Sequence, residues 1–152
     1  MIKHYGFIHE LPNAAVQPDP NLEYKIVYSI TKPAEKQAHP NPGLVHIART
    51  INLYEWAGIA VGQMRLAGVV HGPATPIVLS NPVYQQEFGY DNPDLDLIDQ
   101  LSQAGVELFI CGQSLFGYGY ERDALASGVT FALSALTVLP TYQLKGYALL
   151  NY

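Results

Sequence analysis

Gly-Val-Glu-Leu-Phe-Ile-Cys-Gly-Gln-Ser, residues 105–114, is the stretch of this sequence that says most about its fold and chemistry. Residues 106–110 form a short, largely apolar run, a pattern typical of a strand covered on both faces in a parallel sheet. Gly112 ends the run, and Cys111, the single cysteine of the chain, stands where the strand passes into a loop. If Ser114 caps a helical turn there, backbone N–H groups point toward Cys111 and favour its thiolate. The alternative is a buried cysteine that only packs.

Strands and helices alternate on both sides of this stretch. The expected strands are 24–30, 65–71, 106–111, 129–133 and 147–151, and the expected long helices are 44–57, 94–104 and 134–145. A short helix opens at Pro73 and ends near Ser80, and a turn-rich stretch then runs through Gly89. Pro140 conflicts with the last helix because it removes an N–H group, so we expect a kink or a later start there. The alternation predicts a three-layer α/β domain with a mostly parallel sheet.

The length and the N-terminal composition predict one domain preceded by an arm. A chain of 152 residues is long enough for one domain with its own core, and residues 23–152 are expected to form it. Residues 1–22 contain three prolines among Asn and Asp residues, which favours an extended arm. Such an arm would lie on a neighbouring subunit or wrap its own domain.

The sequence gives no sign of a membrane segment. No apolar run approaches the roughly 20 residues that cross a bilayer, so no membrane partner is expected. The N-terminal residues 1–10 lack the uninterrupted apolar core of a signal peptide, which favours the cytoplasm. Removal of a leader peptide would instead favour the periplasm.

The composition favours a homo-oligomer and argues against nucleic acid as a partner. Charged residues make up 14% of the chain, against about 25% in typical soluble domains, and there are 11 tyrosines. Aromatic surface of this kind is common at subunit interfaces, although a well-filled core would also account for it. The net charge of −5 and the scattered Lys and Arg residues exclude a basic stripe that follows a phosphate backbone.

Motifs for metals and cofactors are absent from the sequence. One cysteine cannot form a multi-cysteine zinc site, and the histidines lack metal-ligand spacing, so no metal is expected. Residues 112–119 are rich in glycine but lack the remaining residues of a P-loop or a dinucleotide fingerprint. No cofactor is therefore expected, and a nucleotide or flavin binder has little support. A group of acidic residues is expected at a helix start and on an exposed face: Asp91, Asp94, Asp96, Asp99 and Glu107.

Candidate site residues follow several of the expected strands. In parallel sheets ligands gather at the carboxyl ends of the strands, where both His71 and Cys111 stand. A histidine beside a thiol could take its proton, whereas the alternative is a histidine that only hydrogen-bonds a turn. The loops after the first and third strands add further polar side chains: Lys32, Lys36, His39, Gln113, Ser114, Tyr118 and Tyr120.

Three ordered motifs resemble those of a known family: Val-Val-His-Gly-Pro-Ala at 69–74, the stretch at 105–114, and Leu-Lys-Gly-Tyr-Ala at 144–148. From about Tyr24 to its end the chain resembles the DsrE/DsrF-like family, the fold family of bacterial sulfur-relay subunits, and its Cys-Gly-Gln-Ser motif is similar to a less characterised branch. The resemblance implies a three-layer α/β/α sandwich with a mostly parallel five-stranded sheet, assembled as trimers or hexamers. In relay members a cysteine at the position of Cys111 accepts sulfane sulfur as a persulfide and passes it to a partner protein.

Two hypotheses about function follow. In the first, the chain is a sulfur carrier or sulfurtransferase-like protein: Cys111 forms the persulfide, His71 assists its deprotonation, and donor and acceptor proteins are its partners. The residues expected to bind the substrate are Gly72, Gly112, Gln113, Ser114, Tyr118 and Tyr120. In the second, the chain is a non-catalytic oligomeric module that binds a small ligand or a partner at the same strand ends, and Cys111 is only packed.

Overall fold

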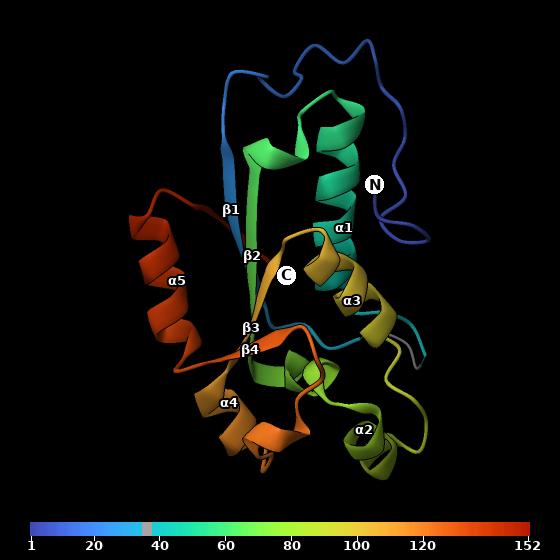
Figure 1. Ribbon diagram of the computed structural model, residues 1–152, viewed down its shortest axis with the longest axis vertical. Coiled ribbons are helices and arrows are strands. Elements are labelled where there is room, and N and C mark those ends of the chain that lie inside the picture. Colours follow the sequence, from blue (N-terminus) through green and yellow to red (C-terminus); the bar gives the residue numbers. More distant parts are fainter. Residues whose placement is uncertain (35–37) are drawn as a thin grey trace.

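Five parallel strands form the centre of the structure, a computed structural model that describes residues 1–34 and 38–152 (Figure 1). The strands are β1 (Tyr24–Ile30), β2 (Met64–Val70), β3 (Glu107–Cys111), β4 (Val129–Ala132) and β5 (Ala148–Asn151). Their order in the sheet is β4-β3-β2-β1-β5, and every neighbouring pair is parallel. The predicted parallel α/β architecture is therefore confirmed. Lys36, one of the candidate site residues, lies outside the described residues.

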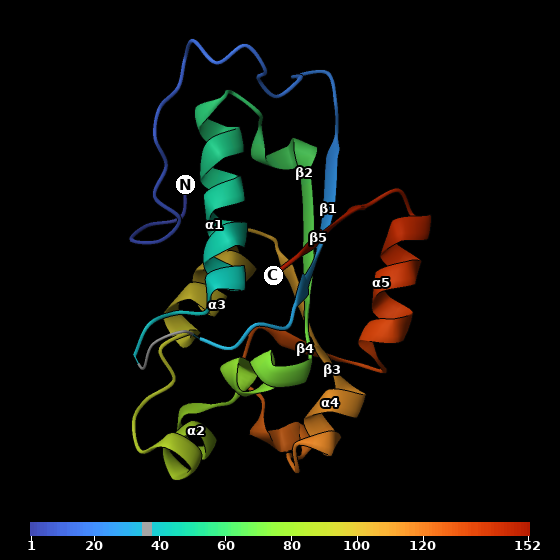
Figure 2. The same cartoon turned by 180° about the vertical axis from the view of Figure 1, so that it is seen from behind.

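Helices cover the two faces of the sheet unequally (Figures 1 and 2). The helices α1 (Pro42–Trp56) and α3 (Leu95–Gln103) lie on one face, and α5 (Ala135–Leu144) lies on the other. The carboxyl ends of the strands lead into α4 (Gly112–Gly117), α2 (Asn81–Phe88) and the 3₁₀ helix η2 (Gly72–Val78). Two further 3₁₀ turns are η1 (Val61–Gln63) and η3 (Arg122–Ala124). These layers form the predicted α/β/α sandwich.

Side chains alternate between two hydrophobic clusters along the strands, as the pleat requires. The larger cluster fills the space between the sheet and α1 and α3, and Tyr28 and Ile110 belong to it. The smaller cluster lies under α5 and consists of Val69, Cys111 and Ala135. Cys111 is thus on the α5 face of the sheet, which is the more thinly covered of the two faces.

The last helix begins where Ser134 predicts it, and Pro140 does not delay it. The Ser134 side chain accepts a hydrogen bond from the N–H of Leu136, and α5 continues through Pro140 to Leu144. The predicted later start is wrong. The ring at Pro140 leaves the carbonyl of Leu136 without its helical donor, and the helix continues past this missing bond.

The helix α2 lies in the stretch expected to hold turns. It has Pro82 in its first turn and ends at Gly89, whose φ of 79° is in the left-handed region. Tyr84 is the one buried residue of α2, and its ring packs on Phe88, four residues later, with centroids 4.5 Å apart. Since a single buried side chain makes no apolar stripe, the helix has little periodic signal in the sequence.

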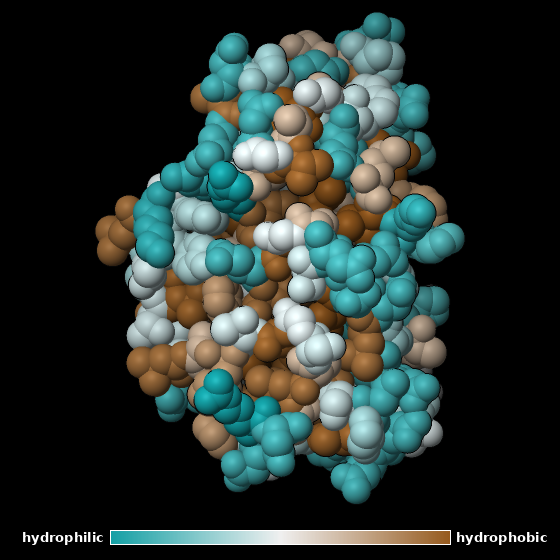
Figure 3. All heavy atoms as spheres, viewed as in Figure 1, coloured by the Kyte–Doolittle hydropathy of each residue, from teal (hydrophilic) through white to brown (hydrophobic). Residues whose placement is uncertain are grey.

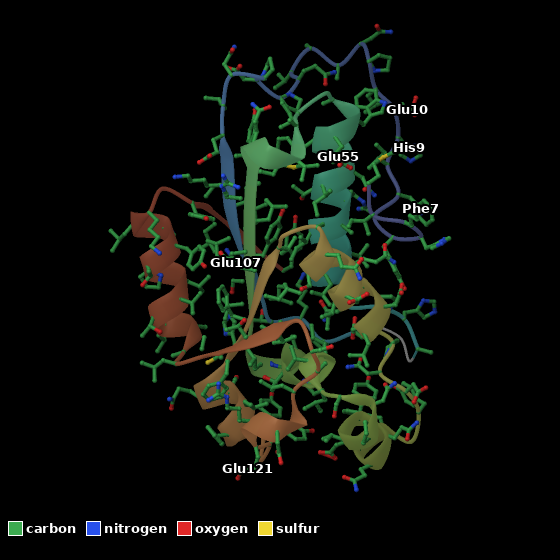
Figure 4. The ribbon with its side chains drawn as sticks, viewed as in Figure 1. Phe7, His9, Glu10, Glu55, Glu107 and Glu121 are labelled. Carbon is green, nitrogen blue, oxygen red and sulfur yellow. The ribbon has the colours of Figure 1, made fainter. Side chains whose placement is uncertain are left out.

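Residues 1–22 form no helix or strand and lie along α1 of their own domain (Figure 2). Asn52 of α1 holds the beginning of this arm: its Oδ1 accepts from the N–H of Ile2 at 2.7 Å, and its Nδ2 donates to the carbonyl of Gly6 at 3.0 Å. A Cβ atom at Gly6, where φ is 65°, would collide with the backbone of α1. Figure 4 shows Phe7 and His9 beside α1, where the arm wraps its own domain.

None of the helices in the described part of the chain combines the length and the hydrophobicity that a membrane-spanning segment requires.

Candidate functional site

Cys111 and His71 lie side by side at the carboxyl edge of the sheet. They directly follow Ile110 and Val70, which are paired in neighbouring strands about 5 Å apart. The alternation of side chains places both on the α5 face. Both line a cavity of about 490 Å³, within the usual range for small-ligand sites. The other lining residues are Gln113, Ser114, Gly117, Tyr118, Ser134, Ala135, Leu136 and Leu139.

Two helix starts converge on the sulfur of Cys111. The backbone N–H groups of Gln113 and Ser114 in α4, and that of Ala135 at the start of α5, lie near Sγ and lower the pKa of the thiol. The thiol itself donates to Oγ of Ser134, which lies 3.8 Å from Sγ. Burial raises the pKa of Cys111, but these neighbouring polar groups outweigh it and lower the pKa below its ordinary value. The thiolate is therefore favoured.

The source of the N–H groups differs in one respect from the prediction. Cys111, not Ser114, occupies the N-cap position of α4. Ser114 lies one turn further on, and its Oγ accepts a hydrogen bond from the N–H of Gly72 at 2.7 Å. This bond ties the loop after β2 to the helix after β3, so the predicted site residues Gly72 and Ser114 connect the two loops.

Gly112 is required by close packing. A Cβ atom at this position would lie 2.7 Å from the carbonyl oxygen of Ala132 and 2.8 Å from the ring of Phe131. The absence of a side chain lets the start of α4 approach the end of β4, which brings Ser134 and Ala135 to the sulfur. Gly112 therefore shapes the site.

His71 is held by β1. Its Nε2 lies 2.8 Å from Oγ of Ser29, a hydrogen bond that orients the imidazole, and its backbone N–H donates to the carbonyl of Ile30 at 3.0 Å. Burial lowers the pKa of His71, so the ring is neutral at pH 7 and can accept a proton. Among the described residues, no hydrogen bond joins His71 directly to Cys111.

The aromatic residues of the following loop divide between two environments. Tyr118 lines the cavity and is 48% exposed. Tyr120 lies outside the cavity lining and packs against the larger core, and its hydroxyl donates to Glu87 at 2.7 Å. Gly119 between them has a φ of 85°, which turns the chain. Gln113 lines the cavity and donates to the carbonyl of Leu133 at 3.4 Å.

Several site residues were not predicted from the sequence. Ser134 was expected to cap a helix, but its place beside Cys111 was not foreseen, and neither was that of Ala135. The sequence did contain a signal for both residues, because they follow β4, whose carboxyl end lies at this same edge of the sheet. Lys32 and His39, which were candidates, do not line the cavity. The described residues contain no cluster of three or more His, Cys, Asp or Glu side chains that could hold a metal ion.

Comparison with protein families gives a match over nearly the whole domain. The model of the DsrE/DsrF-like family matches residues 25–152. The chain belongs to the DsrE/DsrF-like family. This family is associated with sulfur relay. No curated protein matches the chain.

Two solved structures share the DsrE/DsrF-like fold with this chain. A protein of unknown function, MTH1491 from Methanobacterium thermoautotrophicum, is 20% identical with a TM-score of 0.62, and the match covers 85% of this chain and 99% of that one. The ychN protein from E. coli is 18% identical with a TM-score of 0.61 and the same coverage of both chains. At these identities the likeness establishes the fold alone.

Proposed function

We propose that this DsrE/DsrF-like protein is a sulfur carrier in which Cys111 holds sulfane sulfur as a persulfide. The observation that carries the proposal is the convergence of three backbone N–H groups and the Ser134 hydroxyl on one sulfur atom at the wall of a cavity. Hydrogen bonds that favour the thiolate make a cysteine nucleophilic at neutral pH. The family association with sulfur relay supports the same chemistry.

The transfer needs no oxidant. The Cys111 thiolate attacks the outer sulfur of a persulfide or polysulfide donor, and the new Sγ–S bond forms as the S–S bond of the donor breaks. The electron pair of the broken bond leaves on the remaining donor sulfur, which takes a proton. In delivery, the thiolate of an acceptor attacks the outer sulfur of the persulfide, and Sγ is released as a thiolate. The proposed partners are therefore a sulfur donor, either a small compound or a protein, and a protein with an acceptor thiol.

His71 is proposed to move the proton. As a neutral imidazole beside Cys111, it passes the thiol proton to solvent before the donor enters, so the ring is neutral again when the donor binds. A solvent proton relayed through the same ring then goes to the departing sulfur. Ser29 orients the ring for this role. The cavity is the proposed substrate site, and Tyr118, Gln113 and Ser114 form part of its wall.

Assembly into a homo-oligomer, a trimer or a hexamer, is also proposed. Large apolar side chains are exposed around the cavity and along α5, and Figure 3 shows hydrophobic side chains along the edge of the molecule where α5 lies. Leu133, Leu136, Leu144 and Phe116 belong to this set. Monomers rarely expose such surface, so a second copy is expected to cover part of it. Light scattering would measure the mass in solution.

The carrier hypothesis is tested by intact-mass spectrometry after incubation with an alkyl hydropersulfide, R–S–SH, with and without a reducing agent. The expected result is a reducible gain of one or more sulfur atoms that is lost in Cys111→Ser, with the circular dichroism spectrum unchanged. Retained loading in Cys111→Ser, or no loading of the wild-type chain, would contradict the hypothesis.

The alternative is a binding module in which Cys111 is a core residue. Cys111 is 5% exposed and packs with Val69 and Ala135, which favours this alternative. Alkylation distinguishes the two hypotheses. A core cysteine reacts slowly with iodoacetamide until the chain is unfolded, whereas a carrier thiolate reacts in the native protein at neutral pH.

A further inference from the structure

The cavity at Cys111 lacks charged side chains. None of its ten lining residues is Lys, Arg, Asp or Glu, and the titratable base among them, His71, is neutral because burial lowers its pKa. Apolar groups from α5 form one wall: Ala135, Leu136 and Leu139. Tyr118, which directly follows α4, also lines the cavity. A ligand therefore meets apolar carbon and neutral polar groups.

The basic side chains nearest to α5 and β4 in the sequence are engaged elsewhere. Lys145, at the far end of α5, lies with Nζ 5.5 Å from the centre of the Tyr142 ring. Arg122 lies over the ring of Phe131 at 5.2 Å. Neither lines the cavity.

The N–H groups at the cavity wall are already used. Those of Gln113, Ser114 and Ala135 face Sγ of Cys111 and lower its pKa, and that of Gly72 donates to Ser114. A small inorganic anion such as thiosulfate would enter next to a thiolate with no cation to offset the repulsion, in a chain of net charge −5. The site thus disfavours anionic sulfur donors.

We propose that the cavity selects uncharged, apolar compounds that carry a transferable outer sulfur, such as alkyl or aryl hydropersulfides, over anionic sulfur donors. The organic group would pack against Leu136, Leu139 and Tyr118 while its S–S bond faces Sγ. A volume of about 490 Å³ accommodates an aromatic or branched alkyl group. This inference rests on the proposed function, because it names the class of substrate for the same cysteine.

The test compares two aromatic disulfides on the wild-type chain: uncharged 4,4′-dithiodipyridine, and 5,5′-dithiobis(2-nitrobenzoate), which carries two carboxylates. In each reaction the Cys111 thiolate attacks one sulfur, a mixed disulfide forms, and the other half leaves as a coloured thione or thiolate. The same thiolate reacts in both cases, so its abundance cancels in the ratio of the two rates. N-acetylcysteine amide supplies the ratio for a free, uncharged thiol.

The expected ratio of neutral to anionic rate is at least about tenfold higher for Cys111 than for the free thiol. A ratio equal to or below that of the free thiol would overturn the inference and leave the carrier hypothesis standing. If neither disulfide reacts until the chain is unfolded, the proposed function itself fails. The two failures are therefore distinguishable.

Two lysine variants locate the effect. Leu136→Lys adds a positive charge to the cavity wall, and Gln143→Lys adds the same charge at the far end of α5, at an exposed polar side chain outside the apolar set. The first variant should lower the neutral-to-anionic ratio roughly threefold to tenfold, and the second should leave it near the wild-type value. Equal effects of the two would show that overall charge sets the preference and would overturn the inference. If either variant has a different oligomeric state from the wild type, the proposal is decided by the neutral-to-anionic rate ratio of the wild-type chain relative to that of the free thiol.

Discussion

Asp94 is expected to make this protein less stable at neutral pH than at acidic pH. The side chain is 1% exposed, just before α3, and its Oδ1 accepts the N–H of Asn41 at 2.6 Å. Burial raises the pKa of Asp94 from its ordinary 3.8 to about 7, and the hydrogen bond from Asn41 opposes this shift without cancelling it. The folded protein therefore keeps a proton that the unfolded chain releases.

Proton linkage gives the contribution of Asp94 to the free energy of unfolding. The folded-state pKa lies above the unfolded value, so the stabilisation contributed by protonated Asp94 is fully present below about pH 4 and is lost as the pH rises toward 7. The loss is about 1.4 kcal/mol per pH unit across this window, or about 4 kcal/mol in total. Asp94→Asn keeps the acceptor for Asn41 and removes the charge, so it should remove this slope. At pH 8 the variant should be the more stable protein by up to about 4 kcal/mol.

Urea unfolding between pH 4.5 and pH 8, followed by circular dichroism at one protein concentration, measures the effect. Asp99→Asn is the matched control, because Asp99 is an exposed residue of the neighbouring helix, and it should retain the wild-type slope. Parallel stability curves for the wild type and Asp94→Asn would refute the reasoning, because the difference between the two curves isolates the contribution of this carboxyl group.

Two further predictions concern the geometry around the sulfur. Gly112→Ala should destabilise the fold by roughly 2 kcal/mol or more, because its Cβ would meet the Ala132 carbonyl, whereas Gly117→Ala in the same helix has open space and should cost little; equal unfolding midpoints would contradict this. Ser134→Ala removes a helix cap and should cost about 1 kcal/mol. The same change removes one hydrogen bond from Cys111 and should raise its pKa, which the pH dependence of iodoacetamide alkylation measures; an unchanged midpoint would exclude a role for this hydroxyl.

The order of elements was predictable because periodicity and caps are local signals. The apolar run before Cys111 and the cap at Ser134 both lie in the predicted places. The proximity of His71 and Cys111 was harder to predict from the sequence, because it depends on β2 and β3 being neighbours in the sheet. Strand order is set by the packing of the whole sheet and has no local signal. The resemblance of the three motifs to the DsrE/DsrF-like family, and not the periodicity, indicated that Cys111 is a functional position.

The burial of single polar residues could not be predicted locally. Asp94 was assigned to an exposed face together with its acidic neighbours, and this is wrong: Asp91, Asp96 and Asp99 are exposed, but Asp94 is buried. Its burial depends on Asn41, which is 53 residues away in the sequence. Tyr120 likewise lies outside the cavity because of the turn at Gly119, a reversal that a composition rich in glycine and tyrosine does not specify.

The donors around Cys111 also bear on the direction in which sulfur moves. The N–H groups of Gln113, Ser114 and Ala135 lie near Sγ itself, whereas in a persulfide the negative charge moves to the outer sulfur, about 2 Å further away. The site therefore stabilises the cysteine after its sulfur has departed more than it stabilises the loaded form. Because a thiolate of low pKa is a good leaving group, the proposed persulfide on Cys111 would be held weakly and released readily to an acceptor thiol.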